Sequence, residues 1–354
     1  MAKVLMKGNE AIAEAAIRSG CRHYFGYPIT PQTEIAEYLA KMMPKVGGLC
    51  LQAESEIAAI NMVLGASSAG VRVMTSSSSP GISLKSEGIS YIAGSDLPCL
   101  ILNVQRGGPG LGGIQPAQSD YFQATKATGH GDMHLIVLAP NSVQEAADMT
   151  RLAFELGDKY RTPVMMLADG ALGQMMEPVE FTADPLSPAD LPKKEWATCG
   201  HKGERKKNIT NSLYLQPDEL EKSVNARFDR YKTIEENEVL CEEFMTEDAD
   251  IVLVSYGITS RICRSAVLLA REKGIKAGLF RPKTLWPFPN KELLALSEKT
   301  KAFLTVELNM GQMVSDVKLA IECKKPVSFF GRTGGILPTP EEILAQIEKI
   351  GGEI

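Results

Sequence analysis

The segment Glu54-Ser55-Glu56, followed by a run of apolar residues, has the residue types needed for proton transfer. If a helix begins near Ser55, Glu56 shares a helix face with Ile60 and Val63, whereas Glu54 precedes the helix or lies on another side. Glu56 is therefore the glutamate that we expect to be buried. A carboxyl group buried among apolar side chains can exchange a proton near neutrality. The alternative is that both glutamates only stabilise the N-terminus of the helix through its dipole.

A single arginine, Arg106, follows the apolar run Cys99–Val104 and precedes the sequence Gly-Gly-Pro-Gly-Leu-Gly-Gly. A guanidinium in a glycine loop at a strand end is well placed to bind a carboxylate through two hydrogen bonds. A structural ion pair with a nearby Asp or Glu is the alternative. Three of the glycines fit the dinucleotide pattern G-x-G-x-x-G, but Pro109 interrupts it and no amphipathic helix follows at once. This disfavours a nicotinamide-dependent dehydrogenase.

Two prolines stiffen the segment Gly-Tyr-Pro-Ile-Thr-Pro, residues 26–31. Pro28 and Pro31 each fix a backbone angle and prevent a helix from running through the segment. Stiff loops after strand ends hold ligands in parallel sheets. Thr30 and Pro31 also predict an N-cap and first-turn pair for a helix over Pro31–Met43. A capping hydroxyl at that position can face a substrate as well.

A serine-rich segment, Ser76–Lys85, lies between a predicted strand over Val71–Thr75 and a predicted helix near Ser83–Ala93. Hydroxyls and free amides before a helix can form an anion cradle. A flexible turn is the commoner meaning of such a composition.

The composition indicates a globular α/β enzyme and excludes several other classes. The chain is 44% hydrophobic and 23% charged, and its net charge of −5 with a pI near 5.6 argues against nucleic-acid binding. Its seven cysteines are scattered without Cys-x-x-Cys, and its four histidines lack ligand spacing, so we expect no metal and no iron–sulfur cluster on this chain. The absence of a signal-peptide pattern and of a membrane-spanning run predicts a cytoplasmic protein with no membrane contact.

Alternating helical and apolar patterns predict two α/β domains. Residues 1–177 alternate strands and helices in the manner of a parallel sheet covered on both sides. Residues 178–248 are rich in Pro, Lys, Glu and Asn and are predicted to form a long connector. Residues 249–354 resume the alternation as a smaller domain, whose last helix, Thr339–Lys349, has a capping box between Thr339 and Glu342.

The motifs occur in one order: Gly-Tyr-Pro-Ile-Thr-Pro, Glu-Ser-Glu-Ile-Ala-Ala, Ser-Ser-Pro-Gly and Gln-Arg-Gly-Gly-Pro-Gly. This ordered set resembles the pyrimidine-domain subunit of the 2-oxoacid:ferredoxin oxidoreductases, over nearly the whole chain outside the connector. The resemblance implies an α/β fold in which a pyrimidine-type, thiamine-diphosphate-binding parallel sheet domain precedes a smaller domain similar to the transketolase C-terminal domain.

The resemblance also implies roles for particular residues. Glu56 would be the catalytic group, in contact with N1′ of the thiamine aminopyrimidine. Thr30 and Arg106 would bind the 2-oxoacid, Arg106 through its carboxylate. Tyr27, Pro28 and Ile29 would join Glu56 in contacting the cofactor, which carries the chemistry while the protein orients it.

A thiamine diphosphate motif is incomplete on this chain. Members of the family hold the diphosphate and Mg²⁺ with a Gly-Asp-Gly and a later Asn, but Asp169-Gly170 is preceded by Ala168 and no Asn has the required spacing. The resemblance therefore implies a cofactor shared with a subunit that carries the diphosphate and Mg²⁺ motif. It also implies a gamma-type subunit, a ferredoxin-like subunit with iron–sulfur clusters, external ferredoxin, and CoA as co-substrate.

Several readings of the activity stay open. The serine-rich segment and Val306–Met313 look more like the branched-chain and 2-oxoglutarate enzymes than the pyruvate enzyme, and we favour the branched-chain substrate 3-methyl-2-oxobutanoate (2-oxoisovalerate). The alternatives are the same chemistry on 2-oxoglutarate and a non-catalytic assembly subunit of such a complex. A self-sufficient thiamine enzyme would need the missing diphosphate motif.

Overall fold

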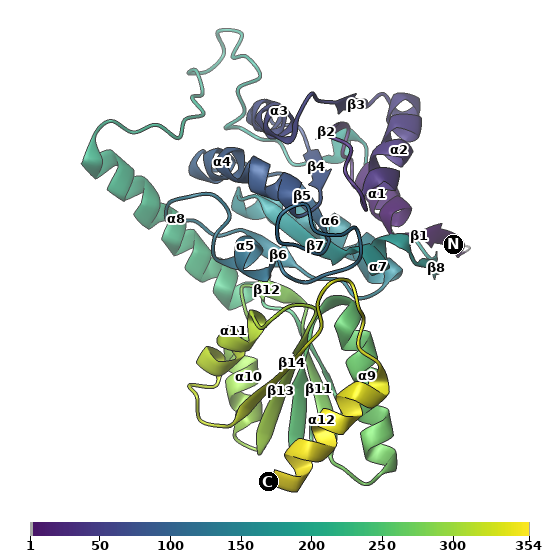
Figure 1. Cartoon of the computed structure of the whole chain (residues 1–354). Coiled ribbons are helices and arrows are strands. Elements are labelled where there is room, and N and C mark those ends of the chain that lie inside the picture. Colours follow the sequence, from purple (N-terminus) through teal and green to yellow (C-terminus); the bar gives the residue numbers. More distant parts are fainter. Residues whose placement is uncertain (1–2, 354) are drawn as a thin grey trace.

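The structure, a computed structural model, describes residues 3–353 and contains two large sheets, one above the other, each enclosed by helices (Figure 1). The upper sheet is built almost entirely from the first half of the chain, and the lower sheet from residues after 240. This arrangement places the strand ends of the first sheet close to the second sheet domain.

The first sheet has seven strands in the order β12-β6-β7-β5-β4-β2-β3, and all neighbours are parallel except β12, which runs antiparallel to β6. Every residue of β5 and β7 is buried, as expected for central strands covered on both faces. The strands are β2 (His23–Gly26), β3 (Leu49–Gln52), β4 (Val73–Ser77), β5 (Leu100–Gln105), β6 (Ile136–Leu138), β7 (Val164–Asp169) and β12 (Thr284–Trp286).

Helices cover both faces of this sheet, which confirms the predicted layering (Figure 1). One group packs α1 against α2 and α6, and the other packs α3 against α4. A Cβ on Gly88 of α4 would lie 2.4 Å from Ile60 Cγ2 of α3, so only glycine allows these two helices to approach so closely. The helices are α1 (Gly8–Arg18), α2 (Thr33–Met42), α3 (Glu56–Ser68), α4 (Pro80–Gly94), α5 (Tyr121–Thr125), α6 (Val143–Tyr160) and α7 (Gly170–Gln174).

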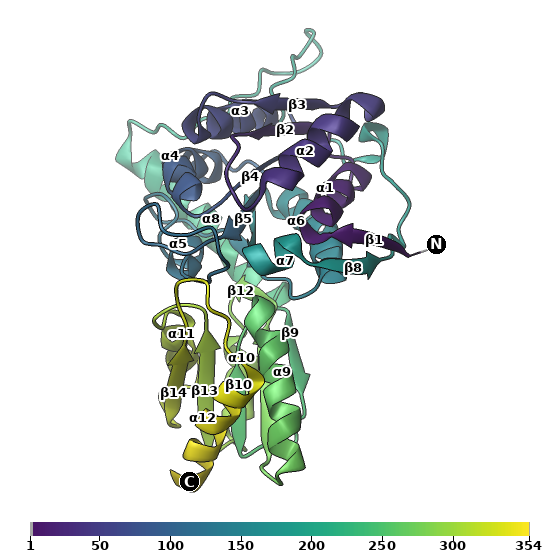
Figure 2. The ribbon, with the colours of Figure 1, turned by 45° about the vertical axis from the view of Figure 1, so that its right-hand side comes forward.

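The second sheet has five strands in the order β14-β13-β10-β11-β9, parallel except for β9. Helix α9 packs against α12, seen in front of the sheet in Figure 2, and α10 packs against α11. The predicted capping box is confirmed, because Glu342 N–H donates to Thr339 Oγ1 and Thr339 N–H to Glu342 Oε2. The elements are β9 (Cys241–Phe244), β10 (Ile251–Val254), α9 (Gly257–Glu272), β11 (Ala277–Pro282), α10 (Asn290–Ser297), β13 (Ala302–Glu307), α11 (Met313–Ala320), β14 (Val327–Gly331) and α12 (Pro340–Glu353).

The segment predicted to be a connector, residues 178–248, contains more regular structure than its composition suggested. Besides a 3-10 turn at Pro188–Asp190, it has the 21-residue helix α8 (Pro217–Asn237), which runs along the side of the molecule towards the second sheet (Figure 1), and strand β9. Arg227 of α8 donates to Asp96 Oδ1 at 3.1 Å, and Tyr231 is buried, so the helix is fixed to the first domain through one face only. A helix with so few buried residues leaves a weak periodic signal in the sequence.

Three further features differ from the sequence prediction. Helix α2 begins at Thr33 with Gln32 at its N-cap position, so the predicted cap by Thr30 with Pro31 in the first turn is wrong. A small antiparallel pair, β1 (Val4–Lys7) with β8 (Met176–Val179), crosses the predicted boundary at residue 177. Strand β12 comes from the second half of the chain but extends the first sheet by pairing with β6. A pairing between segments so far apart in the chain leaves no signal in the local sequence. The three-part division of the chain stays a prediction.

None of the helices within residues 3–353 combines the length and apolar character that a membrane span requires.

A buried ion pair joins the two sheet domains and leads to a prediction on stability. Arg281 of β11, 2% exposed, donates to both carboxylate oxygens of Glu145 on α6 at 2.6 and 2.8 Å. Burial acts to raise the pKa of Glu145, but the hydrogen bonds and charge of Arg281, together with Lys283, lower it to about 2. Since this pKa is depressed in the folded chain, its contribution to stability is complete above about pH 4.5 and is lost as the pH falls towards 2.

We therefore expect Arg281→Met to lower the free energy of unfolding by about 2–3 kcal/mol near pH 7, because among residues 3–353 it leaves Glu145 paired only with Lys283 and Glu242 only with Arg264. Urea unfolding of the variant and of the unchanged chain at pH 7 and pH 3 measures this difference. The difference should shrink at pH 3. An equal loss at both pH values would contradict the assigned role of Glu145.

Candidate functional site

The predicted site residues follow four adjacent strands of the first sheet, in the order β3-β2-β4-β5. Glu56 begins α3 after β3, Thr30 follows β2, Ser77–Ser79 end β4 and precede α4, and Arg106 follows β5. Because these strands are parallel, their carboxyl ends lie at one edge of the sheet, where doubly wound folds bind ligands.

Glu56 is buried, as predicted, and is 6% exposed, whereas Glu54 is exposed. The Ser55 hydroxyl accepts the Ala58 N–H at 3.2 Å and so starts the helix at the position that turns Glu56 inward. A Cβ on Gly81 would lie 2.8 Å from Glu56 Oε1 and 2.1 Å from Ser77 Oγ. Glycine at position 81 thus leaves the space in which the carboxyl group meets the start of α4.

Lys85 is a buried cation beside Glu56 that the sequence analysis did not single out. Its side chain is fully buried and Nζ donates to the Glu56 carbonyl oxygen at 3.4 Å. Burial lowers the pKa of Lys85 to about 8, and the charge of Glu56 opposes that shift. The available signal was its spacing from Ile82 and Ile89, because all three occupy the buried face of α4.

Arg106 begins the glycine loop, residues 106–120 between β5 and α5, and is held there by carbonyl groups. Nη1 donates to the Thr30 carbonyl oxygen at 3.0 Å and Nη2 to that of Leu111 at 3.1 Å. Within residues 3–353, Arg106 forms no ion pair, its two terminal nitrogens donate to carbonyl groups and its buried Nε has no hydrogen-bond partner, so the alternative of a structural ion pair is wrong. The structure brings Arg106 and Thr30 together and leaves the guanidinium charge uncompensated, which suits it for binding an anion.

The loop that contains Tyr27, Pro28, Ile29 and Thr30 is fixed through its backbone. The buried side chain of Gln32 donates to the Tyr27 carbonyl oxygen at 3.2 Å, and Ser76 Oγ donates to Gln32 Oε1 at 2.5 Å. Tyr27, Pro28 and Thr30 themselves are exposed. The Thr30 hydroxyl forms no hydrogen bond with the described residues, so it is available to a ligand.

Ser79 joins the two ends of the glycine loop. Its hydroxyl accepts the Arg106 N–H at 3.0 Å and donates to Asp120 Oδ2 at 2.6 Å. Its backbone has φ +24°, a conformation that non-glycine residues rarely adopt. The segment predicted to be a turn or an anion cradle is thus the end of β4 and the start of α4, and it fixes the loop that contains Arg106.

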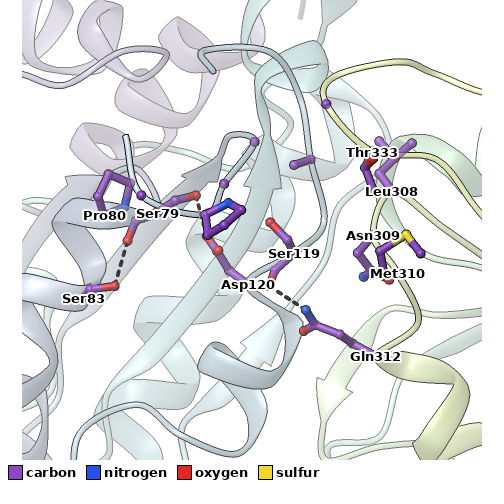
Figure 3. A pocket seen from close by; sticks show the side chains of 16 residues that line it. Ser79, Pro80, Ser83, Ser119, Asp120, Leu308, Asn309, Met310, Gln312 and Thr333 are labelled. Carbon is purple, nitrogen blue, oxygen red and sulfur yellow. Dashed lines mark hydrogen bonds between the residues drawn. The ribbon is translucent and has the colours of Figure 1, made fainter. Parts of the chain in front are cut away.

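A cleft of about 540 Å³ opens between the glycine loop and the second sheet domain (Figure 3). Ser79, Ser83 and Asp120 lie on one side, and Asn309, Met310 and Thr333 lie on the other. Burial raises the pKa of Asp120, while its hydrogen bonds from Ser79 and Asn103 oppose the shift. The cleft therefore leaves the glycine loop accessible from the side of the second domain.

Asp169, the acidic residue of the incomplete diphosphate motif, has a structural role. Its Oδ1 accepts the N–H groups of Ala171 and Leu172 at 2.9 and 3.0 Å, which caps α7. Burial raises the pKa of Asp169 to about 6, and the N–H groups of Leu172, Ala171 and Ile258 limit the rise. No group of three or more His, Cys, Asp or Glu side chains within residues 3–353 is arranged to hold a metal ion.

Comparison with known proteins gives consistent matches over the whole chain. Residues 14–242 match the family model of the pyruvate flavodoxin/ferredoxin oxidoreductase, thiamine diphosphate-binding domain, and residues 249–343 match pyruvate:ferredoxin oxidoreductase core domain II. The ketoisovalerate oxidoreductase subunit VorB of Methanothermobacter marburgensis is 51% identical, with 100% of this chain and 99% of the relative aligned. The 2-oxoglutarate synthase subunit KorA of Methanothermobacter thermautotrophicus is 38% identical, with 98% of each chain aligned.

Solved structures have the same architecture. The 2-oxoglutarate:ferredoxin oxidoreductase from Magnetococcus marinus, with 2-oxoglutarate, coenzyme A and succinyl-CoA bound, aligns with a TM-score of 0.85 at 30% identity. The alignment covers 98% of this chain and 65% of that one, so this chain spans about two thirds of that structure's chain. A split gene transketolase shares the fold with a TM-score of 0.61 at 14% identity, over 97% of each chain.

Proposed function

We propose that this chain, which belongs to the 2-oxoacid:ferredoxin oxidoreductase family, forms the pyrimidine side of a thiamine diphosphate site shared with a partner subunit. The family predicted from the four ordered motifs is confirmed. So is the fold class, a thiamine-diphosphate-binding sheet domain followed by a domain of the transketolase C-terminal type.

The observation that supports this proposal most strongly is the contact between Glu56 and the start of α4. A buried carboxyl group at a strand-end edge matches the need for a group that exchanges a proton with the aminopyrimidine ring. Ser77 Oγ, which lies with Glu56 Oε1 around Gly81, and Ser78 Oγ are buried without hydrogen-bond partners among residues 3–353, so both hydroxyls are free to bind a polar ligand group. The residues present thus fit the pyrimidine half of the cofactor.

Each residue then has a defined task. When bound, thiamine diphosphate supplies the carbanion chemistry that decarboxylation of a 2-oxoacid requires. Glu56 holds a proton at the ring nitrogen, N1′, and Arg106 binds the carboxylate of the 2-oxoacid with the Thr30 hydroxyl beside it. Tyr27, Pro28 and Ile29 form the loop that would contact the cofactor.

The remaining components belong to partners in this proposal. The incomplete Gly-Asp-Gly motif, whose Asp169 caps α7, supports the proposal that another subunit holds the diphosphate and Mg²⁺. A ferredoxin-like subunit would carry the iron–sulfur clusters, a gamma-type subunit would complete the complex, CoA would accept the acyl group and external ferredoxin the electrons. We propose that the complex acts in the cytoplasm.

The favoured substrate is 2-oxoisovalerate. VorB, named for ketoisovalerate, is 51% identical to this chain, and KorA, named for 2-oxoglutarate, is 38% identical. 2-Oxoglutarate is the second candidate.

The test uses the native complex, purified from its source with its partner subunits. Thiamine-dependent reduction of a viologen dye is measured with CoA and with 2-oxoisovalerate, 2-oxoglutarate and pyruvate. The highest kcat/KM with 2-oxoisovalerate is expected. Preference for 2-oxoglutarate would overturn the substrate but keep the reaction, and a thiamine-loaded complex without activity on any 2-oxoacid would overturn the proposed function.

A further inference from the structure

Gln118 lies at the return end of the glycine loop and is fully buried between the two sheet domains. Its side-chain Nε2 donates to the Tyr256 carbonyl oxygen at 2.8 Å. Its Oε1 accepts the Thr259 hydroxyl at 2.9 Å and the Leu308 N–H at 3.0 Å. One side chain thus contacts the end of β10, the first turn of α9 and the end of β13.

The backbone of Gln118 is bound to the same part of the second domain. Gln118 N–H donates to the Leu308 carbonyl oxygen at 3.0 Å, and Asn309 Nδ2 donates to the Gln118 carbonyl oxygen at 2.7 Å. The Tyr256 hydroxyl also donates to that carbonyl at 3.2 Å. Both polar groups of the backbone are therefore satisfied by the second domain, which fixes the position of residue 118 in all directions.

The residues on either side of Gln118 are linked to Arg106 by backbone and side-chain hydrogen bonds. Pro116 forms a β-bridge with Arg106, and Gly107 N–H donates to the Gln115 carbonyl oxygen at 3.1 Å, so the returning strand lies beside the arginine. On the other side of Gln118, Asp120 accepts the hydroxyl of Ser79, which itself accepts the Arg106 N–H. A displacement at residue 118 would therefore reach Arg106 from both sides.

We propose that Gln118 is a positioning residue through which the second domain sets the place of Arg106. This inference rests on the proposed function, since Arg106 is there the group that binds the 2-oxoacid carboxylate. Gln118 does not touch the substrate. Its effect is on the apparent affinity for the 2-oxoacid, because a bidentate pair with a carboxylate is lost when the guanidinium moves.

The test compares variants within the complete complex, assayed by 2-oxoacid-dependent viologen reduction. Gln118→Leu keeps the side-chain size but leaves the Leu308 N–H without its acceptor and removes the Gln118 amide from the Tyr256 carbonyl oxygen and the Thr259 hydroxyl. We expect the KM for the 2-oxoacid to rise by about tenfold or more, with a smaller change in kcat and no change in the KM for CoA. A purely structural role would lower stability and the amount of active complex without separating these constants.

A matched control breaks another contact between the same two domains. Arg261 of α9 donates to Glu177 Oε1 of β8 at 2.7 Å and does not contact the glycine loop. Arg261→Gln should leave the KM for the 2-oxoacid unchanged. An equal rise in KM with this control would overturn the proposal, because it would show a general effect of weaker domain contact.

If the Gln118→Leu chain does not assemble, Thr259→Val is the deciding variant, since it removes the Thr259 hydrogen bonds to Gln118 and to the Tyr256 carbonyl oxygen and leaves the other contacts of Gln118 in place. A raised KM for the 2-oxoacid in that variant supports the proposal, and an unchanged KM overturns it. The unchanged complex serves as the reference for the proposed function itself. If the unchanged complex is inactive on 2-oxoacids, the proposed function is refuted. If it is active and the variants have the same KM for the 2-oxoacid, only the role of Gln118 is refuted.

Discussion

The kcat of the complete complex should fall by about 10²–10⁴-fold when Glu56 is replaced by Gln, the range expected for loss of a proton-transfer group. The amide has nearly the same shape as the carboxyl group and fits beside Ser77 and Gly81, but it cannot transfer a proton to or from the pyrimidine nitrogen near neutral pH. The measurement is the rate of viologen reduction at saturating 2-oxoacid and CoA. Cofactor content is determined on the same samples, so that loss of binding and loss of turnover are separated.

Glu54→Gln is the matched control for this change. Glu54 lies two residues earlier, is exposed, and precedes α3, so its replacement should leave kcat within about twofold. Normal activity of the Glu56→Gln complex would instead favour the alternative of a non-catalytic assembly subunit. It would also mean that the burial of Glu56 serves only the packing of α3 against α4.

Replacing Arg106 by Met should raise the KM for the 2-oxoacid by roughly 10–100-fold, the value of one or two hydrogen bonds to a charged group. The variant removes the guanidinium while keeping an apolar stem of similar length. Arg106→Lys should recover only part of the affinity, because an ammonium cannot form the paired hydrogen bonds of a guanidinium. Steady-state kinetics with the 2-oxoacid as varied substrate and CoA in excess measures both effects.

Arg151→Lys is the control for Arg106→Lys, because it makes the same replacement of arginine by lysine outside the glycine loop. Arg151 lies on α6, where it forms an i,i+4 ion pair with Glu155, and is far from the glycine loop in the sequence. Its replacement should leave the KM unchanged. An unchanged KM in Arg106→Met as well would remove Arg106 from the substrate site and leave its carbonyl contacts as its only role.

Local patterns predicted those parts of the site that depend on a short stretch of chain. The helical spacing of Glu56, Ile60 and Val63 identified the buried glutamate correctly, because residues on one helix face share one environment. The position of Arg106 at a strand end was also predicted, since apolar runs locate central strands. The Thr30 cap failed because the backbone is held instead by Gln32, whose contact with Ser76 is 44 residues away in the sequence.

The sequence by itself indicated the family, the two-sided first sheet and the buried Glu56, but not the order of the motifs along the sheet edge, where Glu56 lies outside Thr30. The sheet and the burial of Glu56 follow from hydrophobic periodicity, and the family from the resemblance of the ordered motifs. Only the tertiary structure decided how Arg106 is held, why Lys85 lies beside Glu56, and how Gln118 connects the second domain to the glycine loop. Gln118 contacts residues 138 to 191 positions away in the chain, and no local pattern records such contacts, because they exist only once both sheets have formed and packed together.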